Sequence, residues 1–219
     1  MSEVEQPRIP ALALPHLEDS SAASLEPQDL RDAERITGAR LTRLDATRAT
    51  IRRCALHLTG VGELTLDHGR LIDSRLTEPE ITTLAAPEST WRGVEVSAGR
   101  IGAVETSAAH WDGVSATDTR VGYLDLRDAT LVDVRLAGCR VDTLDLSGAK
   151  VTRLSLSGCA IGELLVRHAT LTDVDLRGAE LSGVDEAAAL AGAVITPAQL
   201  IDLAPLLANA LGIRVQQAD

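Results

Sequence analysis

The chain has 219 residues, 45% of them hydrophobic, and a formal net charge of −11. It contains no Phe, one Tyr, one Met and two Trp, which argues against an ordinary globular core filled by large aromatic side chains. No apolar run reaches the roughly eighteen residues of a membrane span, and the acidic start differs from a signal peptide, so we expect a cytoplasmic protein without a membrane partner. Negative charge and few aromatic residues also argue against direct nucleic-acid binding.

The first part of the chain is acidic and contains proline. Residues 1–37 hold 8 acidic and 3 basic residues, a net charge of −5, with leucines scattered among them. Because the open ends of a sheet need a cover, we interpret residues 1–38 as a partly disordered acidic tail followed by a cap.

The middle of the chain, residues 39–185, repeats with a period of five. In the stretch LDLRDATLVDVRLAGCRVDTLDLSGAK, an aliphatic residue stands at 126, 131, 136, 141 and 146. A helix repeats its buried side at about 3.6 residues and a strand at about 2, so neither fits. A chain that turns a corner every five residues does fit, and Ser74 is the one clearly polar residue in the first and fourth positions of the blocks of ten from Leu41 to Val184.

Rare residues indicate how many corners make one coil. Trp91 and Trp111 are twenty residues apart, and so are Cys139 and Cys159. Four corners per coil, with successive coils paired as parallel strands about 4.8 Å apart, predict an all-β solenoid of about seven coils over residues 39–184.

Two places in the repeat stand out. Both Trp residues occupy inward positions next to small residues, which favours stacking in the core over the alternative of two exposed binding residues. The stretch around Ser74, Pro79 and Pro87 is the weakest part of the pattern, and we expect a bulge or an irregular corner there.

The sequence of residues 186–219 predicts a helical cap through which two copies of the chain form a dimer. Thr196 is a good N-cap, Pro197 suits the first helical position, Gly212 suits the end, and Pro205 should kink or split the helix. Its apolar arc covers about 220°, whereas one core-facing stripe needs little more than about 100°. We therefore predict a homodimer interface formed by Leu200, Leu203, Leu206, Leu207 and Leu211.

Repeats such as ATLVDVRLAGCRVDTLDLSGAK and ATLTDVDLRGAELSGV resemble those of pentapeptide-repeat proteins. The resemblance covers residues 39–184 and implies a right-handed quadrilateral parallel β-helix. Because a hydrophobic helix closes the chain, it is also similar to the fluoroquinolone-resistance subgroup. This resemblance implies a dimer that imitates duplex DNA and binds DNA gyrase. The chain departs from that subgroup by using Leu and Val in place of Phe and by lacking looped insertions.

The charge of the repeat region weakens the comparison with DNA. Once the two end regions are removed, 21 acidic and 17 basic residues leave a net charge of −4 on the rod. Duplex DNA carries one charge per ~1.7 Å of axis, so a strong mimic of this length needs about twenty net negative charges. We therefore interpret the protein as a non-catalytic interaction or scaffold protein with a macromolecular protein partner; the alternative is a DNA-mimic modulator of DNA gyrase or another type II topoisomerase.

Charged residues also recur at twenty and form two predicted rows on the rod. One explanation is solvated faces with neutralising neighbours, and the other is a bipolar surface that binds a protein partner. The residues of this candidate surface are Arg100, Arg120 and Arg140 in an arginine row, and Glu105, Asp125 and Asp145 in an acidic row.

Signals for chemistry are poor. Cys139 and Cys159 occupy inward positions and are interpreted as core thiols, while Cys54 and His57 form a lone pair of possible metal ligands without a second pair. The sequence contains no Gly-rich phosphate-binding loop, no nucleophile elbow and no paired carboxylates in a fixed cleft. The sequence thus predicts no enzyme activity, no cofactor and no metal.

Overall fold

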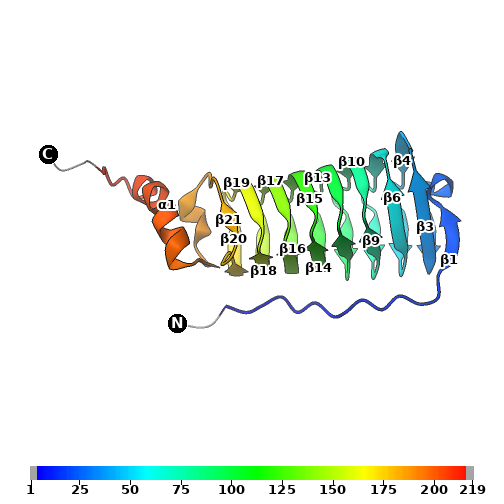
Figure 1. The fold of residues 1–219 in the computed structure, drawn as a ribbon, viewed down its shortest axis with the longest axis horizontal. Coiled ribbons are helices and arrows are strands. Elements are labelled where there is room, and N and C mark those ends of the chain that lie inside the picture. The colour runs from blue at the N-terminus through cyan, green and yellow to red at the C-terminus, as the bar shows by residue number, and fades with distance from the viewer. Residues whose placement is uncertain (1–3, 216–219) are drawn as a thin grey trace.

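The computed structural model describes residues 4–215, and its fold is the predicted right-handed quadrilateral parallel β-helix with one C-terminal helix. About nine coils stack into a rod with the helix at one end (Figure 1). Trp91 pairs with Trp111 and Val141 with Ile161, so one coil contains twenty residues. The four-corner prediction is confirmed.

Two parallel sheets form the walls of the rod. The fourteen-stranded sheet consists of β1 (Glu18–Ser21), β2 (Leu30–Asp32), β3 (Glu34–Ala39), β5 (Thr50–Arg52), β6 (Ala55–Thr59), β8 (Arg70–Ile72), β9 (Arg75–Thr77), β11 (Thr90–Arg92), β12 (Glu95–Ser97), β14 (His110–Thr117), β16 (Thr130–Ala137), β18 (Lys150–Ser157), β20 (Thr170–Asp175) and β22 (Ala193–Val194). The eight-stranded sheet consists of β4 (Arg43–Asp45), β7 (Val61–Thr65), β10 (Glu80–Ala85), β13 (Arg100–Glu105), β15 (Arg120–Asp125), β17 (Arg140–Asp145), β19 (Ala160–Leu165) and β21 (Glu180–Leu181).

The twenty-residue offset changes only near the ends of the ladder. Glu18 pairs with Glu34, and Val174 pairs with Ala193, so both terminal pairs are shorter than a full coil. Short 3₁₀ turns at Ala22–Ser24 and Ala187–Leu190 accompany these changes. Parallel pairing thus begins at Glu18, upstream of residue 39, where the sequence pattern placed the start of the repeats.

Corners of the coils use the left-handed backbone region. In one coil Asp128, Asp133 and Gly138 have φ values of 57°, 54° and 63°. L-residues other than Gly, Asn and Asp seldom adopt this conformation, and it turns the chain sharply enough to point the next residue inward. A repeated corner of this kind fixes the five-residue spacing of the core.

The interior follows the predicted register. Leu146 is 2% exposed, which confirms its inward position, and Ala149 beside it is fully buried. Ser147 and Gly148, predicted to lie outside, are half-buried. Apolar residues at five-residue spacing therefore form one continuous core along the rod.

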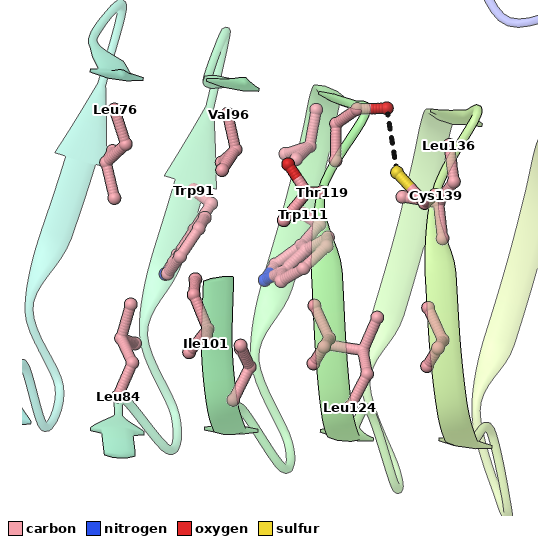
Figure 2. A pocket seen from close by; sticks show the side chains of 15 residues that line it. Leu76, Leu84, Trp91, Val96, Ile101, Trp111, Thr119, Leu124, Leu136 and Cys139 are labelled. Carbon is pink, nitrogen blue, oxygen red and sulfur yellow. Dashed lines mark hydrogen bonds between the residues drawn. The ribbon is translucent and has the colours of Figure 1, made fainter. Parts of the chain in front are cut away.

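Trp91 and Trp111 stack inside the rod, as predicted. Their ring centroids are 5.0 Å apart with an angle of 19° between the planes, and both residues are buried (Figure 2). Trp91 Nε1 donates to Ser89 Oγ at 3.0 Å, whereas Trp111 Nε1 has no acceptor among the described residues. A cavity of about 40 Å³ remains beside the rings and is lined in part by the small residues Ala116 and Thr119. The indoles therefore fill space and are not an exposed binding site.

The irregularity predicted around Ser74 and the two prolines is wrong. Arg75 pairs with Glu95 and Ile81 with Ile101, so the offset of twenty continues through this segment. The carbonyl of Pro79 accepts from the backbone N–H of Arg100, and the equivalent N–H one coil later, that of Gly99, donates to the Thr119 side chain, so the missing proline N–H breaks no backbone pair. Ser74 is fully buried and donates to the Ile72 carbonyl at 2.7 Å, so its hydroxyl is satisfied inside the core.

The C-terminal cap is the helix α1 (Pro197–Ala210). Thr196 caps its N-terminus and forms a capping box with Gln199, as the sequence suggested. Pro205 lies inside α1, which continues past it as a single helix. Gln199 also donates to the carbonyl of Leu176 at 2.7 Å and to that of Ala179 at 2.8 Å, and these bonds tie the helix to the last coils.

Residues 4–17, which we call the strap, run back along the outside of the rod (dark blue in Figure 1). Glu5 bonds to Asp173 near the C-terminal coils, and Leu12 bonds to Glu95 farther toward β1. The interpretation of residues 1–38 as a partly disordered tail and cap did not anticipate this path. Residues 1–3 and 216–219, included in the predicted tail and dimerisation segment, lie outside the described residues.

Candidate interaction surface

The arginine row lies on the eight-stranded sheet. Arg100 pairs with Arg120 and Arg120 with Arg140, so the three residues are one coil apart, about 4.8 Å. All three are exposed, and within residues 4–215 none of them forms an ion pair. Like charges directly opposite one another destabilise a sheet; solvent screening lowers this repulsion, and the exposed Glu80, the ladder partner of Arg100 one coil earlier, adds an opposite charge at one end of the row. The row is therefore open to a partner that supplies negative charge.

The acidic row has the predicted register but a different character. Glu105 pairs with Asp125 and Asp125 with Asp145, yet Glu105 alone is exposed. Asp125 is 3% exposed and Asp145 is 5% exposed. Of the row, only Glu105 can meet a partner directly without a rearrangement.

The two buried carboxylates hold corners of the coil. Asp125 Oδ1 accepts from the backbone N–H of Arg127 at 3.0 Å, and Asp145 Oδ1 accepts from that of Ser147 at 3.0 Å. These are Asx-type turns, in which an Asp side chain satisfies a backbone donor two residues later. Both residues therefore stabilise corners of the fold.

Arg127 and Tyr123 complete this cluster and were not singled out from the sequence. The Arg127 guanidinium makes two bonds to Asp125, at 2.9 and 2.7 Å, and this contact raises the pKa of the guanidinium. Tyr123 donates its hydroxyl to Asp145 Oδ2 at 3.1 Å; burial first, and then that bond, raises the pKa of the phenol to about 12. A groove of about 500 Å³ runs past Glu105, Tyr123 and Arg127. The one Tyr of the chain, two residues before Asp125, was the available signal.

Carboxylates of the fourteen-stranded sheet meet residues that are far away in the chain. Asp133 accepts two bonds from Arg153, at 2.6 and 2.8 Å, and one from the backbone N–H of Arg8 at 2.8 Å. Arg153 holds the pKa of Asp133 below its usual value, with a smaller contribution from the Arg8 N–H. Asp175 accepts three bonds from Arg177, one from its backbone N–H and two from its guanidinium, and one from Gln6, and its pKa is also lowered. The period of twenty places Arg153 one coil after Asp133, but the repeat contains no signal for the contacts with Arg8 and Gln6.

Helix α1 divides the predicted dimer residues into two groups. Leu203 is 5% exposed and Leu207 packs against the core of its own chain. Leu200, Leu206 and Leu211 are exposed, and Ile201 beside them is 73% exposed. The excess apolar arc thus lies uncovered at the end of the rod.

The cysteines and histidines are not grouped as metal ligands among the described residues. Cys54, Cys139 and Cys159 are buried and free, and Cys139 donates to the Ala116 carbonyl (dashed line in Figure 2). His57 Nδ1 lies 3.0 Å from the Thr77 carbonyl oxygen. Within residues 4–215 no three His, Cys, Asp or Glu side chains are grouped to hold a metal ion. No helix in that range is both long enough and apolar enough to span a bilayer.

The class of protein that this geometry defines is a four-sided parallel β-solenoid with a five-residue repeat. Similar solved structures include a trypsin-treated form of QnrB1, a plasmid-mediated fluoroquinolone resistance protein, with 19% identity over 93% of this chain and 98% of that chain and a TM-score of 0.48. Full-length QnrB1 is 20% identical over 90% of this chain and 95% of that chain, with a TM-score of 0.34.

A further similar structure is HetL, a pentapeptide repeat protein involved in heterocyst differentiation regulation from the cyanobacterium Nostoc sp. strain PCC 7120. It is 19% identical over 80% of this chain and 93% of its own, with a TM-score of 0.32. No protein-family model matches the chain, and no curated protein matches it. The fold is that of the predicted pentapeptide-repeat resemblance, and the identity to these solved structures is low.

Proposed function

We propose that the protein is a non-catalytic interaction protein whose outer faces bind a macromolecular protein partner. The observation that carries this proposal is the arginine row: three exposed guanidiniums held in register, with no ion pair among the described residues. A rigid row of this kind suits an acidic protein surface, because complementary charge speeds and orients association. Glu105, one corner away, gives the same region its opposite charge.

Capture of partners on immobilised protein tests this function. The intact chain should retain a protein from its native cytoplasm, and Arg120→Glu should lose that protein, because the central charge of the row is reversed. Arg92→Glu on the fourteen-stranded sheet is a matched control, since Arg92 is also exposed but lies outside the row. Equal capture by Arg120→Glu and the intact chain would contradict the assignment of the row.

We also propose that α1 forms a homodimer through its uncovered residues Leu200, Leu206 and Leu211. Leu211→Asp should give monomers by light scattering without a loss of thermal stability, because Leu211 is 75% exposed. Leu203→Asp should instead unfold the cap, since Leu203 is buried within its own chain. An intact chain that is monomeric at micromolar concentration would refute the dimer.

Modulation of DNA gyrase by DNA mimicry is the weaker candidate. The rod has a net charge of only −4, and two of the three acidic-row carboxylates are buried. We expect weak or no inhibition of gyrase supercoiling at physiological ionic strength, because a DNA mimic acts mainly through charge. Potent inhibition that Glu105→Gln removes would reverse this order.

A further inference from the structure

The strap is held by side chains of the coils that grip its backbone. The amides of Arg8 and Leu12 donate to the carboxylates of Asp133 and Glu95, at 2.8 and 3.3 Å. The amide of Glu5 donates to Asp173 at 3.1 Å. Two guanidiniums of the coils donate to carbonyls of the strap: Arg135 to Pro7 at 3.4 Å, and Arg75 to Leu12 at 3.5 Å. Such contacts recognise the backbone of an extended chain more than its side chains.

The spacing of these contacts matches an extended chain to the stack of coils. Asp173 and Asp133 are two coils apart, about 9.6 Å, and they bond to Glu5 and Arg8, three residues apart. Three residues of polyproline II conformation advance about 9.3 Å. The strap contains prolines at 7, 10 and 15, which favour extended backbone and reduce the entropy lost on binding.

Three of the four carboxylates that bind the strap also form ion pairs within the coils. Arg153 pairs with Asp133, Arg177 with Asp175, and Arg75 with Glu95, so removal of the strap leaves none of these three carboxylates as an unpaired buried charge. Among the described residues no backbone-to-backbone hydrogen bond joins residues 4–17 to the coils; the first is from Glu18. The surface beneath the strap is thus preorganised, and the strap can leave it without breaking the ladder.

We propose that this surface is a binding site for an extended, proline-containing apolar peptide, and that the strap is its resident occupant. The site, called the strap face, is formed by Arg75, Glu95, Asp133, Arg135, Asp173 and Asp175. The occupant that it accepts from a partner protein has free amides at about every third or fourth residue and apolar side chains like those of Val4, Pro7 and Leu12. This inference rests on the proposed function, since it names a second outer face and its ligand.

Competition with the strap gives the test. The probe is a fluorescent peptide with the sequence of residues 4–17, titrated into the full chain and followed by anisotropy. The double variant Val4→Asp, Pro7→Asp places charges at the two buried strap positions and should open the strap. We expect at least tenfold tighter peptide binding by this variant than by the intact chain, because the strap no longer competes. Ala11→Asp, Ala13→Asp alters exposed strap positions and should bind like the intact chain.

Two further measurements assign the binding to the strap face. Adding Asp133→Asn to the open variant should weaken the peptide at least fivefold, with unchanged circular dichroism showing that the rod remains folded. A peptide N-methylated at Arg8 loses the N–H that meets Asp133 and should bind weakly, whereas N-methylation at Ala13, whose amide makes no hydrogen bond among the described residues, should have little effect. A peptide in which the three prolines are Ala should also bind more weakly.

The outcomes separate this inference from the proposed function. A folded open variant that fails to bind the peptide, or that binds it no more tightly than the intact chain, overturns the inference. A doubled molecular mass of the open variant with no gain in peptide affinity would also overturn the inference, because it would assign the strap face to a second copy of the chain. Arg120→Glu should leave peptide binding unchanged, so loss of partner capture without loss of peptide binding tests the arginine row alone.

Discussion

Two buried carboxylates of the rod, one on each sheet, are held in different ways. On the eight-stranded sheet, Asp125 is held by Arg127 of its own corner. On the fourteen-stranded sheet, Asp133 is held by Arg153 of the next coil and by Arg8 of the strap, 125 residues away in sequence. The first kind of contact is made within a single corner, whereas the second kind also involves the strap. Asp175 of the fourteen-stranded sheet combines both kinds of contact, because Arg177 of its own corner and Gln6 of the strap both donate to it.

The largest effect is expected in the core that both sheets share. Leu146→Asp should destabilise the rod by at least ~4 kcal/mol, or prevent folding, because it buries a charge without a partner. Ser147→Ala should change the unfolding free energy by less than ~0.5 kcal/mol, since the side chain of Ser147 makes no hydrogen bond among the described residues. Urea denaturation measures both, and an unchanged midpoint for Leu146→Asp would refute the inward register.

A pair of intermediate substitutions separates the two kinds of carboxylate. Asp125→Ala and Asp133→Ala should each destabilise the protein by ~1–3 kcal/mol, because each leaves a backbone or guanidinium donor without its acceptor. Only Asp133→Ala should also raise the hydrogen-exchange rate of the strap. If both variants loosened the strap equally, the distinction between local and exchangeable contacts would fail.

A smaller effect is expected from acid. The pKa of Asp133 and that of Asp175 lie below the usual 3.8, because Arg153 and Arg177 stabilise the charged forms. Lowered values mean that this stabilisation is complete above about pH 5 and is lost as the pH falls below about 4, through the folded-state values. The melting temperature should fall over that acid range, and less steeply in Asp133→Asn. A profile identical in the variant would show that Asp133 takes no part.

The rod was predictable from sequence because its period is local. Apolar residues every five positions and Trp at twenty define the corners, and the arginine row followed from the same arithmetic. The burial of Asp125 and Asp145 was not predictable, because an Asx turn depends on where the carboxylate points at a corner. Pro79 was misjudged as a source of irregularity, since only its carbonyl is needed in the ladder. The strap shares no period with the coils, and no residue pattern connects Arg8 to Asp133.

Helix α1 shows the same limit at the end of the rod. Its cap was predictable from Thr196 and Pro197, whose effects are local. The sequence did not predict which leucines remain uncovered, because that depends on how the helix lies on the last coils. Leu203 is buried and Leu211 is exposed.

Amide hydrogen exchange of the intact chain, resolved to single residues, tests most directly whether the rod holds a replaceable peptide on one face. The strap amides should exchange by local opening, far faster than the paired amides of β16 and β18, because only side chains of the coils hold them. Within the strap, the Arg8 and Leu12 amides should be slower than the Ala13 amide, and an added peptide of residues 4–17 should speed all of them. Strap amides that exchange as slowly as those of β16, with no response to the peptide, would show that the strap is a fixed part of the fold and contradict the account.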